Sequence, residues 1–436
     1  MTENEYRFDT LKVRSAYNSK EHNYAVSVPI YQTASFDLGD TARAERLFRF
    51  REMGWRYSRL GNPTVNVFER RVAALDGASG GVALASGMAA ITCTVLNLAE
   101  VGGRILSTPW LYGGTSDGFQ KLFPRLGIHV DLAEDLNDIE DLERRIGPDT
   151  KALFVESVSN PNGVVADIEA LAEAAHRHGI PLVVDNSFAT PCLCRPIEYG
   201  ADIVVYSATK ALSGHGNLIA GVIVESGKFP WDNGRFPQFL EKHYTLRNSK
   251  GEPRSVLEFA PDMPFTFRLR TQYLPYIGPA LGPFEAYLAL IGIETLSERV
   301  YKQTASALKV AEHLRGREQV EQIRYSSLPD SPQRERAEKY LPKGAGAIFS
   351  FILKGDDEQT EAFIDALRLF SYHANVGDAR SLIVNPSKTT HGDLSPEELE
   401  KAGVEPNLIR LSIGLEDPLD LIEDLDRAFA AAFSDA

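Results

Sequence analysis

Polar residues that could do chemistry follow three short apolar runs in the middle of the chain. Glu156, Asp185 and the run Ser207-Ala208-Thr209-Lys210 each come directly after such a run. The runs are rich in β-branched residues, which is typical of buried strands. Because ligands bind beyond the carboxyl ends of the strands in an open α/β sheet, these polar groups are expected to meet at one edge.

Lys210 is the most reactive of these residues. Gly214-His215-Gly216 follows it closely, so the lysine is expected in a crevice and not in bulk water. Partial burial disfavours the ammonium form and lowers the pKa of the amine, which can then form a Schiff base with an aldehyde. A solvated loop lysine is the alternative interpretation of this position taken alone.

The other groups needed by an aldehyde cofactor lie nearby in the predicted fold. Ser207 and Thr209 carry hydroxyls suited to a phosphate, and a helix start at Ser86-Gly87-Met88 adds free N–H groups. Asp185 can pair with a protonated pyridine nitrogen, and Tyr112 can stack on the ring. Each feature alone could be a turn, a helix cap or simple packing. Together they predict pyridoxal 5′-phosphate (PLP) as the cofactor.

The elements that must position these residues alternate between strands and helices from about Pro63 onward. This alternation predicts an α/β fold with a mostly parallel sheet and helices on both faces. The expected strands are Arg104–Ser107, Ala152–Glu156, Leu182–Asp185, Ile203–Tyr206 and Ala220–Val224. The expected helices are Val65–Leu75, Ser86–Ala99, Asn137–Arg145 and Ile168–His178.

Three regions are expected along the chain. Residues 1–60 are mostly irregular and predict an arm that contacts a neighbouring subunit, and residues 61–275 predict a large cofactor-binding domain. The large domain ends in an irregular excursion rich in proline and aromatic residues, from Phe229 to Tyr276. Residues 276–436 predict a smaller C-terminal α/β domain. Its expected helices are Pro283–Arg315, Glu358–Phe370 and a final helix capped by Asp417. Its expected strands are Ala347–Ile352 and Ile409–Ile413.

Composition excludes several classes of protein. The chain has 436 residues, 43% hydrophobic and 24% charged, with a formal net charge of −14. This acidic, globular composition argues against nucleic-acid and anionic-membrane partners. No apolar run reaches the roughly eighteen residues that span a bilayer, and the polar start is not typical of a signal peptide. Three cysteines, at 93, 192 and 194, form neither a disulfide framework nor a metal-ligand set, so a cytoplasmic protein without metal is expected.

The residues around the lysine resemble a known family. Asp185-Asn186-Ser187 together with Ser207-Ala208-Thr209-Lys210 is similar to the Cys/Met-metabolism family of PLP enzymes, which includes cystathionine synthases and lyases and homoserine-ester sulfhydrylases. The resemblance runs from Val28–Thr33 to Arg410–Glu416. It implies the PLP-dependent transferase fold of the aspartate-aminotransferase type (fold type I), assembled as a homotetramer of two dimers.

The resemblance also implies roles for individual residues. The implied catalytic residues are Lys210 as the Schiff-base lysine, Asp185 and Tyr112. The cofactor would be held by Lys210, Asp185, Gly87, Met88, Ser207, Thr209, Tyr112 and Asn160, with Tyr57 and Arg59 reaching the phosphate of a neighbouring subunit. The substrate would be bound by Arg410, Ser381, Asn160 and Tyr57.

Within the family, the chain is most similar to the O-acetylhomoserine sulfhydrylases. The similarity is carried by Gly214-His215-Gly216, the excursion after Phe229 and the run Asn375–Leu382, whereas Asn217-Leu218, Ala220 and Ser187 depart from the usual pattern. It implies γ-replacement on an O-acyl-L-homoserine by sulfide or a small thiol, with the acetyl ester as the expected substrate and the succinyl and phosphoryl esters left open. The products would be L-homocysteine or L-methionine, plus acetate.

Other functions remain as alternatives. A PLP-dependent γ-lyase, or an enzyme of the cystathionine γ-synthase type, would keep the cofactor and change the outcome. A dehydrogenase is disfavoured because no Gly-x-Gly-x-x-Gly follows an early strand. A non-catalytic scaffold is disfavoured by the intact set of Lys210, Asp185 and Arg410.

Overall fold

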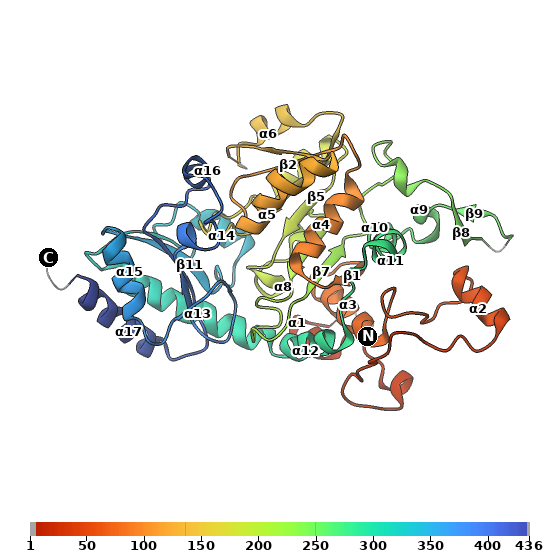
Figure 1. The fold of residues 1–436 in the computed structure, drawn as a ribbon, viewed down its shortest axis with the longest axis horizontal. Coiled ribbons are helices and arrows are strands. Elements are labelled where there is room, and N and C mark those ends of the chain that lie inside the picture. The colour runs from red at the N-terminus through yellow and green to blue at the C-terminus, as the bar shows by residue number, and fades with distance from the viewer. Residues whose placement is uncertain (1–5, 136, 249, 434–436) are drawn as a thin grey trace.

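The computed structural model describes residues 6–135, 137–248 and 250–433. Figure 1 shows a larger sheet at the centre, a smaller sheet toward the C-terminus and an N-terminal arm on the opposite side. Over the described residues, no helix is both long and apolar enough to cross a membrane.

The larger sheet contains the strands that lead into the predicted site. Within the described residues it has seven strands in the order β1-β7-β6-β5-β4-β2-β3. Among the seven described strands, β7 alone runs in the opposite direction to the other six, so the prediction of a mostly parallel sheet is confirmed. The strands are β1 (Gly80–Leu84), β2 (Arg104–Ser107), β3 (His129–Leu132), β4 (Thr150–Glu156), β5 (Leu182–Asp185), β6 (Ile203–Ser207) and β7 (Gly221–Glu225).

Two apolar cores lie on the two faces of this sheet. Leu153 and Val155 of β4 join the core that also holds α3 (Pro63–Asp76) and α7 (Ile168–Arg177). Phe154 points to the core under α4 (Gly87–Leu98), which is drawn in front of the sheet in Figure 1. Alternation of this kind is what a strand buried on both faces requires.

The helices next to the site begin and end at residues suited to those positions. The Asn62 side chain accepts from the Thr64 N–H before α3, and Gly77 ends that helix with a φ of 70°. The Ser86 hydroxyl accepts from the Ala89 N–H at 3.0 Å and so caps α4. Both helices were predicted within a few residues of their observed ends.

The C-terminal part forms a smaller sheet, which has five strands over the described residues in the order β10-β11-β14-β13-β12. The strands are β10 (Val320–Arg324), β11 (Ile348–Leu353), β12 (Ser371–Tyr372), β13 (Leu382–Val384) and β14 (Leu408–Ser412). The helices of this part are α14 (Arg334–Tyr340), α15 (Asp357–Ala366), α16 (Pro396–Lys401) and α17 (Pro418–Ala432). Asp417 caps α17 as predicted.

The prediction of one long helix at Pro283–Arg315 is wrong. The segment forms two helices, α12 (Pro283–Glu294) and α13 (Leu296–Arg315), which meet at Thr295. Thr295 has a φ of −117° and a ψ of 21°, and the Arg299 guanidinium donates to the Gly292 carbonyl at 2.7 Å. A tertiary contact therefore replaces the hydrogen bond that would continue the helix, and apolar periodicity does not reveal this.

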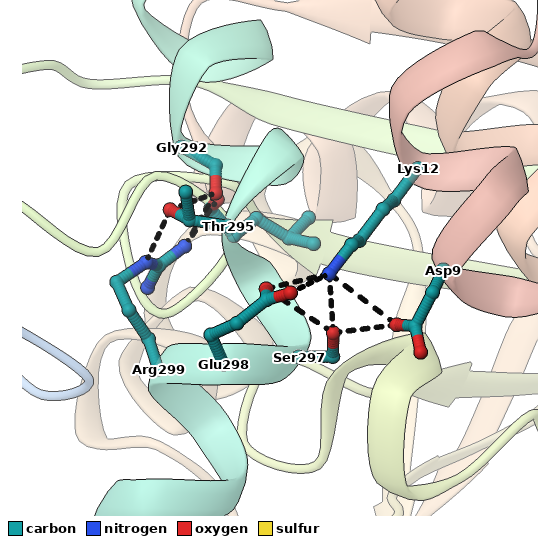
Figure 2. A network of polar contacts seen from close by, with 8 residues as sticks. Asp9, Lys12, Gly292, Thr295, Ser297, Glu298 and Arg299 are labelled. Carbon is teal, nitrogen blue, oxygen red and sulfur yellow. Dashed lines mark hydrogen bonds and ion pairs between the residues drawn. The ribbon is translucent and has the colours of Figure 1, made fainter.

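The start of the arm packs on its own chain. Helix α1 (Phe8–Arg14) lies against α3 and α12, and Figure 2 shows Lys12 reaching the start of α13. The Lys12 ammonium donates to the Ser297 hydroxyl at 2.5 Å and pairs with Glu298 and Asp9. Beyond α1, the arm exposes apolar side chains, and its contact with a second subunit stays a prediction.

The excursion after Phe229 is packed more tightly than its sequence suggests. Trp231 stacks on Phe239 and Phe265 with ring centroids 4.2 and 5.6 Å apart. The buried carboxylate of Glu225 accepts hydrogen bonds from the N–H groups of Phe265 and Thr266.

The short elements of the excursion are β8 (His243–Arg247), β9 (Pro253–Arg254), α9 (Val256–Phe259), α10 (Pro264–Arg268) and α11 (Leu274–Ile277). The other α-helices of the described chain are α2 (Thr41–Phe48), α5 (Gly113–Asp117), α6 (Ile139–Arg145) and α8 (Thr190–Leu193).

Candidate active site

A cavity of about 240 Å³ lies at the carboxyl ends of β4, β5 and β6. Its wall is built by these strand ends, by the start of α4 and by loops from the smaller sheet. Nine of the residues predicted for the site line it: Gly87, Met88, Tyr112, Asn160, Asp185, Ser207, Thr209, Lys210 and Arg410. The fold thus brings together groups that lie more than 300 residues apart in the sequence.

One end of the cavity is shaped for an anion. The first N–H groups of α4, at Gly87 and Met88, have no acceptor within the helix, and the helix dipole is positive there. A Cβ on Gly87 would lie 2.6 Å from the Cβ of Ser207, so only glycine lets β6 approach this closely. Gly221 is similarly constrained, because its Cβ would lie 2.1 Å from the Ser86 carbonyl oxygen.

Lys210 lies in the cavity wall with its amine partly withdrawn from water. Burial, with a smaller contribution from the Arg410 charge, lowers the pKa of Lys210 to about 8. Its Nζ donates to Asn375 Oδ1 at 2.7 Å, and no carboxylate of the described residues pairs with it. About one tenth of this amine is therefore neutral and nucleophilic at pH 7, and about half of it at pH 8.

Two carboxyl groups lie side by side behind the lysine. Glu156 and Asp185 are register partners on β4 and β5, and burial raises the pKa of both, with the Asp185 charge raising that of Glu156 further. Asp185 Oδ1 accepts from the Ser187 N–H at 2.9 Å. A buried acid of this kind can stabilise a cationic group placed against it.

Arg410 is a buried cation without an anionic partner. Its side chain, on β14, is 3% exposed, and none of the carboxylates in the described chain pairs with it. One Nη donates to Asn160 Oδ1 at 2.9 Å and the other to the Asn375 carbonyl at 3.2 Å. Because a buried charge without a counter-ion is costly, the guanidinium is suited to a carboxylate ligand.

Three predicted residues lie outside this cavity wall. Tyr57 is 41% exposed on the arm, and the Arg59 guanidinium lies 5.0 Å from its ring centroid. Ser381 is fully buried, and its hydroxyl donates to Glu416 and accepts from the Gly414 N–H. In this chain Ser381 therefore braces the strand end after Arg410 and does not face the cavity.

Several residues of the cavity were not predicted as site residues from the sequence. Asn375 stands out because its side chain contacts Lys210 and its carbonyl contacts Arg410. Thr390, like Asn375, comes from the C-terminal part of the chain that forms the smaller sheet. The apolar part of the wall is formed by Ile91, Val158, Phe188, Ile219 and Val376. The places of Asn375, Val376 and Thr390 depend on how loops of the smaller sheet meet the larger one, which no local pattern encodes.

A buried guanidinium holds the turn that follows Lys210. Arg299 donates to the carbonyls of Ala211 and Leu212 at 2.9 and 3.3 Å. It also donates to the Gly292 carbonyl, a contact that Figure 2 shows. Gly214 has a φ of 72°, and a Cβ there would lie 1.8 Å from an Arg299 nitrogen. The lysine turn therefore depends on glycine at this position.

Replacing Gly214 by alanine is expected to lower the free energy of unfolding by about 2–4 kcal/mol, because backbone strain adds to a clash with Arg299. Gly77→Ala is the matched control, since Gly77 has a φ of 70° but nothing within 4 Å of the added Cβ. Its cost should be about 1 kcal/mol. Urea unfolding measures both, and equal losses for the two variants would contradict the predicted clash.

The sequence and the structure of this chain are similar to those of known proteins. The model of the family described as "Cys/Met metabolism PLP-dependent enzyme" matches residues 9–430. Sulfhydrylase FUB7 of Gibberella moniliformis is 42% identical over 98% of both chains. O-acetyl-L-homoserine sulfhydrylase 1 of Thermus thermophilus is 41% identical over 97% of this chain and 100% of its own. A crystal structure from Campylobacter jejuni, described as an O-acetylhomoserine (thiol)-lyase with a pyridoxyl-lysine monophosphate, superposes with a TM-score of 0.92 at 36% identity, over 97% of this chain and 100% of its own.

Proposed function

Because the chain belongs to the Cys/Met-metabolism family of PLP-dependent enzymes, we propose that it catalyses γ-replacement on an O-acyl-L-homoserine. The proposed ester is O-acetyl-L-homoserine, and the proposed nucleophile is sulfide or a small thiol. The products are L-homocysteine or L-methionine, plus acetate. The observation that carries this proposal is one cavity that holds both a partly neutral lysine and a buried arginine with no carboxylate partner among the described residues.

The cavity fits the cofactor on the structure's own evidence. The start of α4 leaves N–H groups for a phosphate, and Gly87 allows the approach of Ser207. The Ser207 and Thr209 side chains line the same end of the cavity. Asp185 lies buried where it can hold a proton on the pyridine nitrogen, and Tyr112 can stack on the ring. When bound, the cofactor supplies an electron sink for charge that develops on the amino-acid substrate.

The residues of the chain divide the work of the reaction. Lys210 would hold the cofactor, and its free amine would accept the proton from the substrate Cα, for which a pKa of about 8 is well suited. Arg410 binds the α-carboxylate and so orients the Cα–H bond, while Asn160 fixes the guanidinium. Tyr112 lies in the same wall and can relay a proton to the departing ester oxygen.

The charge of the cavity favours a neutral acyl group. Among the described lining residues, the basic side chains are Lys210 and Arg410, and the acidic ones are Glu156 and Asp185. Lys210 is committed to the cofactor and Arg410 to the α-carboxylate. A succinyl or phosphoryl ester would therefore bring a further anion into a buried space without a free cation, which is costly. An acetyl ester avoids this cost.

Steady-state kinetics with the three esters tests the proposal. The acetyl ester is expected to exceed the succinyl and phosphoryl esters in kcat/KM by about 100-fold, a difference of about 2.7 kcal/mol in transition-state binding. Each ester is assayed with sulfide and with methanethiol, and products are identified. Formation of 2-oxobutanoate in place of homocysteine would instead make the protein a γ-lyase.

We further propose that the enzyme is a cytoplasmic homotetramer in which Tyr57 and Arg59 reach the cofactor phosphate of a neighbouring subunit. Both residues lie on the arm outside the cavity of their own chain, and a phosphate in that cavity would gain a cation from Arg59 of another copy. The three cysteines are free and buried, which is compatible with a reducing compartment.

A further inference from the structure

We propose that Glu156 is a positioning residue that holds two parts of the site, the Tyr112 segment and the Asn160 segment, in register with each other. The inference rests on the proposed function, because it concerns how the substrate carboxylate is bound and how the cofactor ring is positioned. Glu156 ends β4 in the cavity wall and has no role in the mechanism described above.

The two oxygens of Glu156 serve two different loops. Oε1 accepts from the Tyr112 N–H at 2.6 Å, and Oε2 accepts from the Asn160 N–H at 3.0 Å. The side chain is 7% exposed, so water does not compete strongly for these bonds. The two N–H bonds favour the ionised form of Glu156 and oppose the larger increase in its pKa that burial and the Asp185 charge cause. One carboxylate thus joins the loop after β2 to the loop after β4.

Each of these loops carries a group that the reaction uses. Asn160 Oδ1 accepts from Arg410 at 2.9 Å, so the position of its backbone sets where the guanidinium points. Tyr112 precedes Gly113, where a Cβ would lie 2.1 Å from the Thr390 carbonyl oxygen, so this segment also abuts the smaller domain. A shift at Glu156 therefore moves both the substrate anchor and the stacking ring.

A glutamine cannot perform this task at position 156. The two donors approach separate oxygens, and a glutamine would present an NH2 group to one of two N–H donors. One bond would be lost and a buried donor left without an acceptor. Aspartate keeps both acceptors but is one methylene shorter, so it should restore the link in part.

The same sheet provides a matched control. Glu225, at the end of β7, is also buried, and it accepts from the Phe265 and Thr266 N–H groups at 3.2 and 2.7 Å. Its strand runs antiparallel to β4, β5 and β6, and Glu225 is not among the residues of the cavity wall. Glu225→Gln therefore removes an equivalent buried link without touching the site.

The test compares E156Q, E156D and E225Q in two measurements. In the cofactor-free protein, amide hydrogen exchange is expected to become faster at Tyr112 and Asn160 in E156Q, and at Phe265 and Thr266 in E225Q. In the holoenzyme, E156Q should raise KM for O-acetyl-L-homoserine about 10- to 100-fold, because Arg410 is displaced. E156D should lie between E156Q and wild type, and E225Q should keep the wild-type KM.

The outcomes separate the two proposals. Unchanged exchange at Tyr112 and Asn160 in E156Q, or a KM no different from that of E225Q, would overturn the role of Glu156. If the wild-type holoenzyme lacks γ-replacement activity, the proposed function fails. In that case the affinity of each variant for L-homoserine, measured through the change in cofactor absorbance, still decides whether Glu156 positions Arg410. Weaker binding by E156Q than by E225Q supports the role, and equal binding refutes it.

Discussion

Changing Lys210 to alanine is expected to lower kcat/KM for O-acetyl-L-homoserine and sulfide by about 10⁴-fold, since both the covalent link to the cofactor and the base at Cα are lost. The variant should fold, because no ion pair of the described chain involves this lysine and its one side-chain hydrogen bond goes to Asn375. Borohydride reduction followed by peptide mapping should find the pyridoxyl mass on Lys210 of the wild type and on no peptide of the variant.

Lys151→Ala is the control for that experiment. Burial also lowers the pKa of Lys151, and its Nζ donates to the Arg235 carbonyl at 2.9 Å, but it does not line the cavity. It should keep nearly full activity. In the wild-type apoprotein, the rate of cofactor uptake should rise with pH as the Lys210 amine loses its proton, with a midpoint near pH 8. A midpoint near that of a solvated lysine, or pyridoxyl mass elsewhere, would contradict the assignment.

Changing Arg410 to lysine is expected to lower kcat/KM for the ester by about 100-fold, chiefly through KM, because a point charge replaces a planar fork that binds a carboxylate at two positions. The lysine would also lose one of the contacts to Asn160 and Asn375 that orient the guanidinium. Steady-state kinetics over a range of ester concentrations separates KM from kcat.

A second buried arginine shows whether that loss is specific. Arg71 is 1% exposed and contacts the Ser15 carbonyl and Glu294, away from the cavity. Arg71→Lys should lower stability and leave KM for the ester unchanged. If Arg410→Lys kept the wild-type KM, or if both variants changed it equally, Arg410 would not be the anchor of the substrate carboxylate.

Local patterns in the chain predicted most of the large domain. The strands ending at Glu156 and Asp185 were placed within two residues, because short β-branched runs buried on both faces have a clear signature. Helix α3 was placed by apolar residues at helical spacing that end at Gly77, and α4 by its start at Ser86, and both signals are local. Gly80–Leu84 was missed as a strand, because its first two residues are glycines that leave no apolar pattern to detect.

The site residues likewise fall into those predicted from local sequence and those placed only by the tertiary structure. Asp185, Ser207, Thr209 and Lys210 were found from the sequence, because their chemistry and their place after buried strands are both local properties. Asn375 was not, since it acts only after a loop of the smaller domain has folded against the larger sheet. The substrate-binding role expected for Ser381 stays a prediction; in this chain its hydroxyl contacts Glu416 and Gly414.

The sequence by itself determined which cofactor chemistry this protein can support, because a lysine, an aspartate and a helix start follow strands whose direction is set by their order along the chain. Only the tertiary structure decided where the arginine and asparagine of the smaller domain lie, and that α12 and α13 are separate helices. The physical reason is the distance along the chain over which each feature is encoded: the apolar pattern of a strand and the hydrogen bonds of a helix cap involve neighbouring residues. The contacts of Arg410 and Arg299 join parts of the chain that meet only after folding.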